Sequence, residues 1–249
     1  MNEEIVKKMK EMRLYGMLRA FQTSLVSDTM NNLTKDEMIA QLVEEEWDDR
    51  YNRRIARITQ SAKFHYKASI EQMNFNIDRG IDKNQVMRLA ECTFIKNKEN
   101  IMITGSTGIG KSYLASAIGQ QACNLGYKVM YYNATKLFAK LKMAKADGSY
   151  INEIAKMERQ QLLILDDLGI QPLDAQSRSA LMEIIEDRHE KASTLITSQV
   201  PVAKWYDIIG EKTIADAIMD RIIHNAHRLE LSGESLRKKY LKKGELNIN

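Results

Sequence analysis

The residues at 105–112, GSTGIGKS, have the composition and spacing of a phosphate-binding loop. Glycines let successive backbone N–H groups turn toward phosphate oxygens, and a helix N-terminus directly after the loop favours an anion. Lys111 can reach the β- and γ-phosphates of a nucleotide, and the Ser112 hydroxyl can bind Mg²⁺. The predicted nucleotide contacts are Gly105, Ser106, Thr107, Gly108, Ile109, Gly110, Lys111, Ser112 and the adjacent Tyr113.

Two carboxylates follow a run of four apolar residues, Leu162 to Leu165. Such a run predicts a buried parallel strand, whose carboxyl end faces the phosphates in folds of this kind. Asp166 is then predicted to hold Mg²⁺ through water, and Asp167 to orient or deprotonate the attacking water. A surface turn at DDLG is the alternative, but buried carboxylates are costly without a cation or donors. Together with Lys111, this pair predicts Mg²⁺-dependent ATP hydrolysis.

The elements that must position these residues alternate along the chain. Five strands are predicted at 99–104, 128–133, 162–166, 193–198 and 227–231. Helices are predicted between them at 111–124, 134–146, 149–158, 174–190 and 212–226. This alternation predicts an α/β fold, with a parallel five-stranded sheet and helices on both faces.

The N-terminal part has a different pattern, which predicts helices only. Apolar residues at Leu14, Leu18, Phe21 and Leu25 predict one helix over 3–26. Thr34 and Glu37 form a capping box that starts a second helix, which runs to about residue 60. Its predicted inward-facing stripe is Trp47, Tyr51, Ile55 and Ile58. Because the pattern changes near residue 68, we predict a small all-α domain at 1–67 and an ATPase domain at 68–249, joined through a linker at 68–80.

Composition excludes several classes of protein. Cys92 and Cys123 are far apart and lack CxxC partners, which argues against a disulfide framework or a cysteine-rich metal site. The first ten residues lack the apolar core of a signal peptide, and no run of about eighteen apolar residues occurs. We therefore expect a cytoplasmic protein without membrane contact. A net charge of +4 is compatible with a nucleic-acid partner but does not require one.

The chain resembles the IstB-type transposition helper ATPases of the AAA+ class, which are close to the DnaC-like helicase loaders. The resemblance spans nearly the whole chain and is carried, in order, by GSTGIGKS, LLILDDLG, TLITSQVPVAKW, AIMDRIIHNA and LSGESLR. The N-terminal EEEWDDRYNRRIARI and ASIEQMNF favour the IstB group over the loaders. The resemblance implies an AAA+ P-loop NTPase core.

The same resemblance implies roles for residues outside the loop. Ser198 would be the polar sensor near the γ-phosphate, with Thr197 as a neighbour able to share that task. Arg221 would be an arginine finger that reaches the ATP of a neighbouring subunit, and Arg237 would be a second sensor for the subunit's own ATP. This implies a homo-oligomer with ATP at its subunit interfaces. The alternatives are a local ion pair for Arg221 and an ordinary tail charge for Arg237.

The predicted helix at 134–146 carries the residues that we predict to bind DNA. Leu137, Leu141 and Ala144 form its inward stripe. The resemblance to initiator-like AAA+ proteins makes its lysines candidate phosphate contacts, and arginines of the N-terminal domain are further candidates: Lys136, Lys140, Lys142, Lys145, Arg50, Arg54 and Arg57. We expect contacts to the backbone of double-stranded DNA with little sequence specificity. The alternatives are a solvated lysine face and arginines paired with Glu46 and Asp49.

These inferences combine into one expected function. The protein would be an ATPase that assembles on double-stranded DNA and assists a transposase or recombinase, with hydrolysis stimulated by DNA and by oligomerisation. The first alternative is a helicase loader that acts on single-stranded DNA and a helicase. The second is a small-molecule kinase, for which we find no arginine-rich lid segment.

Overall fold

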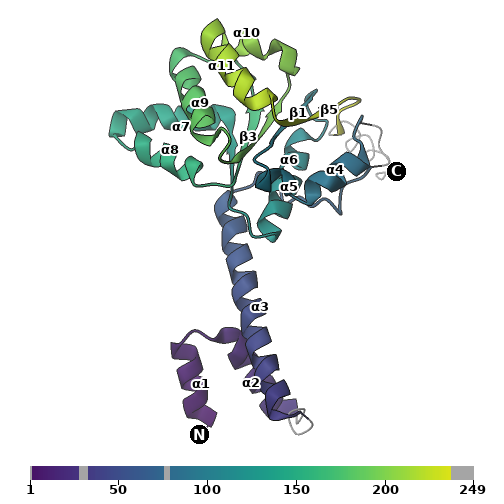
Figure 1. Cartoon of the computed structure of the whole chain (residues 1–249), viewed down its shortest axis with the longest axis vertical. Coiled ribbons are helices and arrows are strands. Elements are labelled where there is room, and N and C mark those ends of the chain that lie inside the picture. The colour runs from purple at the N-terminus through teal and green to yellow at the C-terminus, as the bar shows by residue number, and fades with distance from the viewer. Residues whose placement is uncertain (1, 28–32, 76–78, 237–249) are drawn as a thin grey trace, which may run out of the picture. The chain divides into compact units, whose positions relative to one another are not determined.

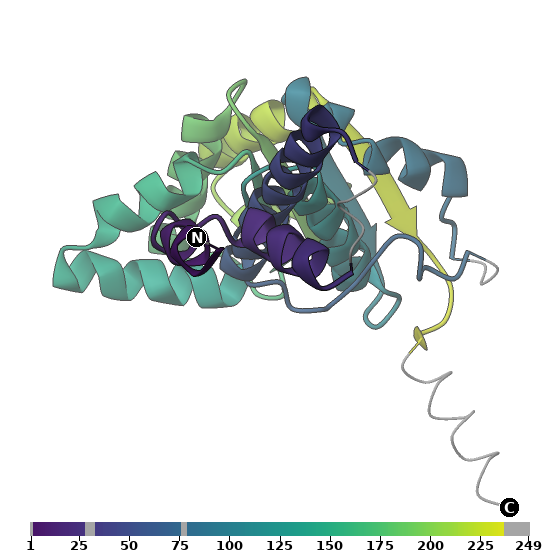
Figure 2. The same cartoon turned by 90° about the horizontal axis from the view of Figure 1, so that it is seen from below.

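A parallel sheet occupies the centre of the larger part of the chain. The computed structural model describes residues 2–27, 33–75 and 79–236 (Figure 1). The sheet has five parallel strands in the order β2-β3-β4-β1-β5. Figure 2 shows β5, in yellow, at one edge. The strands are β1 (Asn100–Gly105), β2 (Val129–Asn133), β3 (Leu162–Leu168), β4 (Ser193–Ser198) and β5 (Ala226–Leu231). The predicted five-stranded parallel sheet is confirmed.

Helices cover both faces of this sheet, as predicted (Figure 1). Alternate residues of β1 enter opposite cores, because successive side chains of a strand point to opposite faces: Ile101 and Ile103 join one apolar cluster and Met102 joins the other. The first cluster includes side chains of α4 (Lys83–Ala90), α5 (Thr93–Lys96) and α6 (Lys111–Asn124). The second includes side chains of α7 (Ala134–Asp147), α8 (Tyr150–Glu158), α9 (Ala175–Arg188), α10 (Trp205–Ile209) and α11 (Lys212–Ile223).

The chain divides into two compact units, Met1–Arg57 and Ile58–Asn249. The sequence pattern instead places a boundary after residue 67. Residues beyond Arg57 pack in the second unit: Ala62 is buried in its first apolar cluster, and the ring of Phe64 meets Tyr131 edge-on. The helix α3 (Lys35–Ala62) therefore contributes residues to both units.

The first unit corrects the prediction of a single helix at 3–26. The structure has α1 (Asn2–Glu11) and α2 (Tyr15–Ser27), separated by Arg13 in the left-handed conformation at φ 58°. The backbone N–H of Leu14 donates to the carbonyl of Met9 and closes the turn. Leu25, which belongs to the apolar pattern used to predict the helix, is exposed. The turn ends the first helix because a left-handed residue cannot continue it.

The apolar stripe predicted on α3 is also wrong at its first two residues. Trp47 is 72% exposed and Tyr51 44% exposed. The side that faces α2 instead carries Glu46, whose carboxylate accepts hydrogen bonds from the backbone N–H groups of Gly16 and Met17 at 2.9 and 3.2 Å. A second buried acid on this side, Asp49, pairs with Arg19 and Arg53. Periodicity alone could not reveal this, because polar side chains join these helices.

The predicted capping box at the start of α3 is confirmed. The backbone N–H of Thr34 donates to Glu37 at 2.8 Å, and that of Glu37 donates to the Thr34 hydroxyl at 3.3 Å.

Cys92 and Cys123 are free and buried, and burial raises the pKa of their thiols to about 12 and about 11. None of the helices in the described part of the chain has the length and apolarity of a membrane span.

Candidate nucleotide-binding and catalytic site

The predicted phosphate loop connects the end of β1 to the start of α6. Gly105 has φ 148°, and a Cβ added there would lie 2.3 Å from the carbonyl oxygen of Leu231 on β5. Gly110 caps α6 at φ 106°, a conformation that favours glycine. The buried ammonium group of Lys111 donates to the carbonyls of Gly105 and Ser106 at 2.7 and 2.9 Å. Burial lowers the pKa of Lys111, although the charges of Asp167 and Asp166 oppose this effect.

A cavity of about 440 Å³ opens beside this loop. It brings together most of the residues predicted for nucleotide binding with one of the two carboxylates: Thr107, Gly108, Gly110, Lys111, Ser112, Tyr113 and Asp167. The remaining walls come from Gln199, which follows β4, and from Tyr66, Gln72, Met73, Asn74, Arg79 and Leu236. Backbone donors, a cation and a carboxylate around one cavity provide the groups that phosphoryl transfer needs.

The carboxylate of Asp166 is 2% exposed and accepts two hydroxyl hydrogen bonds. Tyr131 on β2 donates to one oxygen, and Thr197 on β4 donates to the other at 2.5 Å. Burial, together with the hydrogen bond to Asp166, raises the pKa of Tyr131 well above its usual value. These two hydroxyls offset the desolvation of a charge that would otherwise be costly to bury.

Asp167 takes a left-handed conformation at φ 59°, which is unusual for a residue with a side chain. Its backbone N–H donates to the Thr197 hydroxyl at 2.9 Å. The pairing of β3 with β4 shifts register between Leu165 and Leu168, so the strand is irregular at the two carboxylates. Thr197 therefore contacts both acidic residues and fixes the turn that presents Asp167 to the cavity.

Ser198 is completely buried, and its hydroxyl is engaged away from the cavity. The hydroxyl donates to the carbonyl of Leu168 at 2.7 Å and accepts from the backbone N–H of Val200 at 3.1 Å. The next residue, Gln199, lines the cavity, and its side-chain oxygen accepts a hydrogen bond from Thr107 at 2.5 Å. Sequence reasoning missed Gln199, although a polar residue directly after the end of a parallel strand is a signal for it.

Four residues of the segment 68–80, which the sequence pattern suggests is a linker, line the cavity: Gln72, Met73, Asn74 and Arg79. Ile70 and Met73 are buried in the larger unit, and Arg79 is 6% exposed. The Arg79 guanidinium donates to the carbonyl of Asn74 at 2.7 Å and lies 3.0 Å from a Cβ built on Gly110. The apolar residues Ile70 and Met73 are the feature of the sequence that could have indicated this packing.

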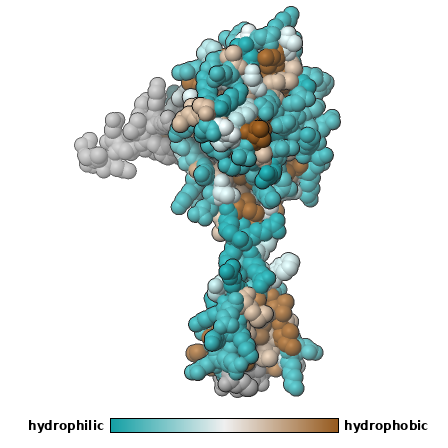
Figure 3. Space-filling model, turned by 90° about the vertical axis from the view of Figure 1, so that its left-hand side faces the viewer, coloured by the Kyte–Doolittle hydropathy of each residue, from teal (hydrophilic) through white to brown (hydrophobic). Residues whose placement is uncertain are grey.

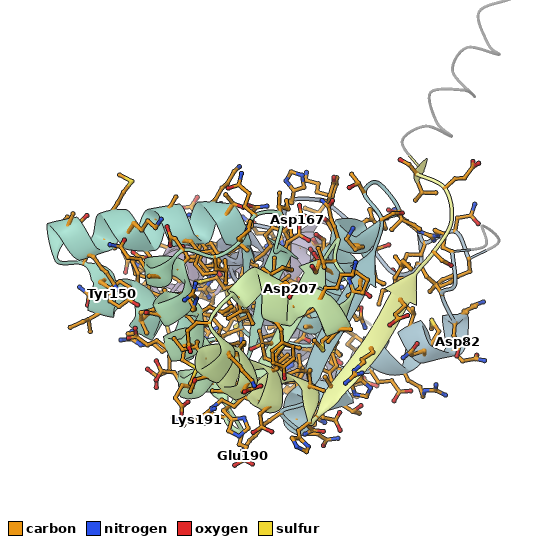
Figure 4. All side chains as sticks on the ribbon, turned by 90° about the horizontal axis from the view of Figure 1, so that it is seen from above. Asp82, Tyr150, Asp167, Glu190, Lys191 and Asp207 are labelled. Carbon is orange, nitrogen blue, oxygen red and sulfur yellow. The ribbon has the colours of Figure 1, made fainter. Side chains whose placement is uncertain are left out.

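Arg221 lies at the other end of the sheet. It lines a second cavity of about 400 Å³ together with Asn100 at the amino end of β1 and with Glu190. In Figure 4, Asp167 and Glu190 lie at opposite ends of the sheet. The Arg221 guanidinium pairs with Glu186 of α9 at 2.6 Å. Arg221 is thus not in the nucleotide cavity of its own chain, and Arg237 lies outside the described residues.

The lysines of α7 differ in their surroundings. Lys140 pairs with Glu153, Lys142 pairs with Asp174, and Lys145 lies 4.7 Å from the ring centre of Tyr150. Lys136 is exposed and has no ion pair within the described ranges. The predicted inward stripe is confirmed, because Leu137, Leu141 and Ala144 are buried.

Among the N-terminal arginines, Arg50 pairs with Glu46 at 2.6 Å. This pairing is the alternative that the sequence left open for Arg50. Arg54 and Arg57 are exposed and make no ion pair with any residue that the structure describes. Arg57 donates only to the carbonyl of Arg53, at 3.3 Å, so the charge of each guanidinium remains available for an external anion.

Several solved structures share the fold of this chain. The chain superimposes on DnaI with a TM-score of 0.57 at 24% identity, covering 68% of this chain and 90% of that one. For the DnaC helicase loader the TM-score is 0.56 at 19% identity, with 69% and 100% covered. For AMPPCP-bound DnaA from Aquifex aeolicus it is 0.57 at 20% identity, with 75% and 57% covered. These similarities define the fold as that of the AAA+ P-loop ATPases.

Sequence relatives identify the family to which the chain belongs. A family model described as IstB-like ATP binding protein matches residues 7–244. A relative described as an insertion sequence ATP-binding protein, y4pL of Sinorhizobium fredii, is 42% identical over 95% of this chain and 96% of its own length. The insertion sequence IS21 ATP-binding protein of Pseudomonas aeruginosa is 31% identical over 83% of this chain and 78% of its own. The chain belongs to the IstB-like ATP-binding protein family and is an AAA+ ATPase.

Proposed function

We propose that the chain hydrolyses ATP with Mg²⁺, assembles on double-stranded DNA and assists a transposase. The observation that carries this proposal is the convergence of the phosphate loop, Lys111 and Asp167 on one cavity, in a chain whose relatives are insertion-sequence proteins. Lys111 would exchange its two loop carbonyls for the β- and γ-phosphates. Ser112 and Asp166 would hold Mg²⁺, which neutralises charge on the phosphates when bound.

Two further groups would act on the attacking water. Asp167 would orient or deprotonate it, and its left-handed backbone supports this role, because unfavourable backbone conformations cluster at functional sites. Gln199 is the better candidate than Ser198 for the polar sensor, because Gln199 lines the cavity while the Ser198 hydroxyl is bonded elsewhere. Arg237 keeps its proposed role as second sensor.

Arg221 would act on the ATP of a neighbouring subunit in a homo-oligomer. Its position at the amino ends of the strands supports this, since it cannot serve the cavity at the carboxyl ends of its own strands. The guanidinium would first have to leave Glu186. Because ATP would then contact two subunits, nucleotide binding and assembly would stabilise each other.

The DNA contacts are proposed for exposed cations of both units. Lys136, Arg54 and Arg57 are the strongest candidates, because they make no ion pair among the residues described. The candidates that already have partners, Lys140, Lys142, Lys145 and Arg50, would exchange or share them. Contacts to phosphates predict affinity that falls steeply with salt and depends little on sequence. The helical domain, proposed as residues 1–67, would bind DNA or the partner protein.

The test is an ATPase assay of the full chain with and without duplex DNA. Wild type, Lys111→Ala and Arg221→Ala are assayed separately, and then the two variants are mixed. We expect duplex DNA to stimulate wild type, each variant alone to be inactive, and the mixture to recover part of the activity. The mixture recovers because an intact Arg221 can then act on an intact loop across an interface. Absence of hydrolysis by folded wild type would refute the proposal.

A helicase loader is the second candidate, favoured by the fold shared with DnaI and with the DnaC helicase loader. The same assay distinguishes the two, since a loader should respond more strongly to single-stranded DNA than to duplex. The curated relatives from insertion sequences favour the transposition role.

A further inference from the structure

The first half of α3 exposes an apolar stripe in the Met1–Arg57 unit. Ile39, Val43 and Trp47 are 57%, 53% and 72% exposed. They are spaced four residues apart, so their side chains share one side of the helix. Figure 3 shows exposed apolar side chains on the surface of this unit. Soluble monomers seldom leave a contiguous set of large apolar groups in water, and such a patch commonly marks a binding surface.

This stripe forms the floor of an open groove of about 570 Å³, which we call the α3 groove. It is lined by Asp36, Ile39, Ala40, Val43, Glu44 and Trp47. Ala40 is the smallest side chain in this lining. Among the residues that the structure describes, the lining of the groove includes no lysine or arginine, whereas that of the nucleotide cavity includes both.

The charge of the groove selects its ligand. Asp36 and Glu44 line it, and neither carboxylate has an ion pair within the part of the chain that the structure describes. Two other acids of the same helix are neutralised, since Glu46 pairs with Arg50 and Asp49 pairs with Arg53. The groove is therefore apolar with an uncompensated negative rim. A phosphate backbone would be repelled there, whereas lysine or arginine side chains would be attracted.

We propose that the α3 groove docks a cationic amphipathic segment of the partner transposase. Apolar side chains of that segment would cover Ile39, Val43 and Trp47, and its basic side chains would meet Asp36 and Glu44. This inference rests on the proposed function, because that function supplies the partner. It adds where the partner binds and assigns protein rather than DNA to this side of α3.

Trp47 offers a direct probe of the groove. The chain has two tryptophans, and the other one, Trp205, is 1% exposed. Emission from an exposed indole therefore comes from Trp47. Docking of an apolar segment should move that emission to shorter wavelength, because the indole leaves water.

The experiment titrates the full-length ATPase with a tryptophan-free variant of the transposase from the same insertion sequence. Duplex DNA alone and a dilution series of the ATPase are run alongside. Glu44→Lys and Glu45→Lys form a matched pair, since both are exposed acids on α3 but only Glu44 lines the groove. We expect a blue shift with transposase, an affinity at least about tenfold weaker for Glu44→Lys, and little change for Glu45→Lys.

Circular dichroism is used to check that both variants fold. We expect them to fold, because both substituted side chains are on the surface. Equal weakening by both substitutions, or by neither, would overturn the inference, as would no transposase binding to wild type. A blue shift with duplex DNA alone would assign the groove to nucleic acid. A blue shift that follows ATPase concentration would assign it to a second copy of the chain. DNA-stimulated hydrolysis is measured on the same samples, so failure of the proposed function is read separately from failure of the docking surface.

Discussion

Replacing Thr197 with valine should remove the hydrogen bonds that this residue makes with Asp166 and Asp167, while preserving the shape of the core. The Thr197 hydroxyl donates to Asp166 and accepts from the backbone N–H of Asp167. Valine has nearly the same volume but cannot form either hydrogen bond. The variant therefore removes a positioning group without opening a cavity.

The expected magnitude follows from the two partners that Thr197 leaves behind. Each buried polar group left without its hydrogen bond costs about 1–3 kcal/mol. Asp166 is buried and keeps only its bond from Tyr131, whereas Asp167 is half-exposed and can be hydrated. We therefore expect the free energy of unfolding to fall by about 2–3 kcal/mol. Because supporting groups around a metal ligand typically contribute 10–100-fold to metal affinity, half-saturation by Mg²⁺ should rise by about that factor.

Fluorescent ATP binding measured against Mg²⁺ concentration tests this, with chemical denaturation as the stability readout. Thr194→Val is the matched control, since Thr194 is also buried on β4 but its hydroxyl accepts from Arg188 rather than contacting Asp166. The control should lose stability and keep the wild-type Mg²⁺ dependence. If Thr197→Val shifted only stability, or if both variants shifted the Mg²⁺ dependence equally, the positioning role of Thr197 would be refuted.

Three other predictions concern the loop, the arginine and acid stability. Gly105→Ala should abolish ATP binding and lower the melting temperature, because its Cβ would lie 2.3 Å from the Leu231 carbonyl; normal binding in calorimetry would contradict the loop geometry. Glu186→Gln should raise the ATPase rate severalfold at limiting protein concentration, because Arg221 loses its ion pair; an unchanged or lower rate would show that the pair does not restrain Arg221. Burial raises the pKa of Glu46, but hydrogen bonds from an arginine and two backbone N–H groups outweigh this and hold it below its usual value. The stability it contributes is thus present above the unfolded pKa of about 4.3 and lost as pH falls through the lower folded pKa. Amide exchange in α2 should accelerate over that acidic range in wild type and less so in Glu46→Gln; identical profiles would exclude Glu46 as the cause.

The fold and the phosphate loop were predictable because their signals are local. The loop is contiguous in sequence, and runs such as Leu162 to Leu165 identify buried strands without knowledge of their neighbours. Strand order was not predicted, since β1 lies between β4 and β5 only through long-range pairing.

The hydrogen bonds that hold Asp166 and Asp167 come from residues on neighbouring strands, so they could not be predicted in full from the sequence. Tyr131 reaches Asp166 because β2 pairs with β3, and nothing near Tyr131 in the sequence indicates this contact. At the end of β4, the residue that lines the cavity is one position after the predicted sensor, because neighbouring side chains of a strand point in opposite directions. Ser198 consequently turns into the core, while Gln199 reaches the cavity.

In the N-terminal helices, hydrophobic periodicity predicted some of the buried residues wrongly. Trp47 was predicted as a core anchor from its spacing, but the contact between α2 and α3 uses Glu46 and Asp49. The exposed Trp47 is then free to contribute to a binding surface, which periodicity cannot distinguish from a core stripe.

Calorimetric titration of the folded chain with ATP and Mg²⁺ tests the central claim most directly, with Lys111→Ala as the comparison. We predict saturable binding at one site per chain in wild type and loss of that binding in the variant, because Lys111 lines the cavity and holds the loop carbonyls. No detectable heat of binding in folded wild type, or undiminished binding by the variant, would contradict the account.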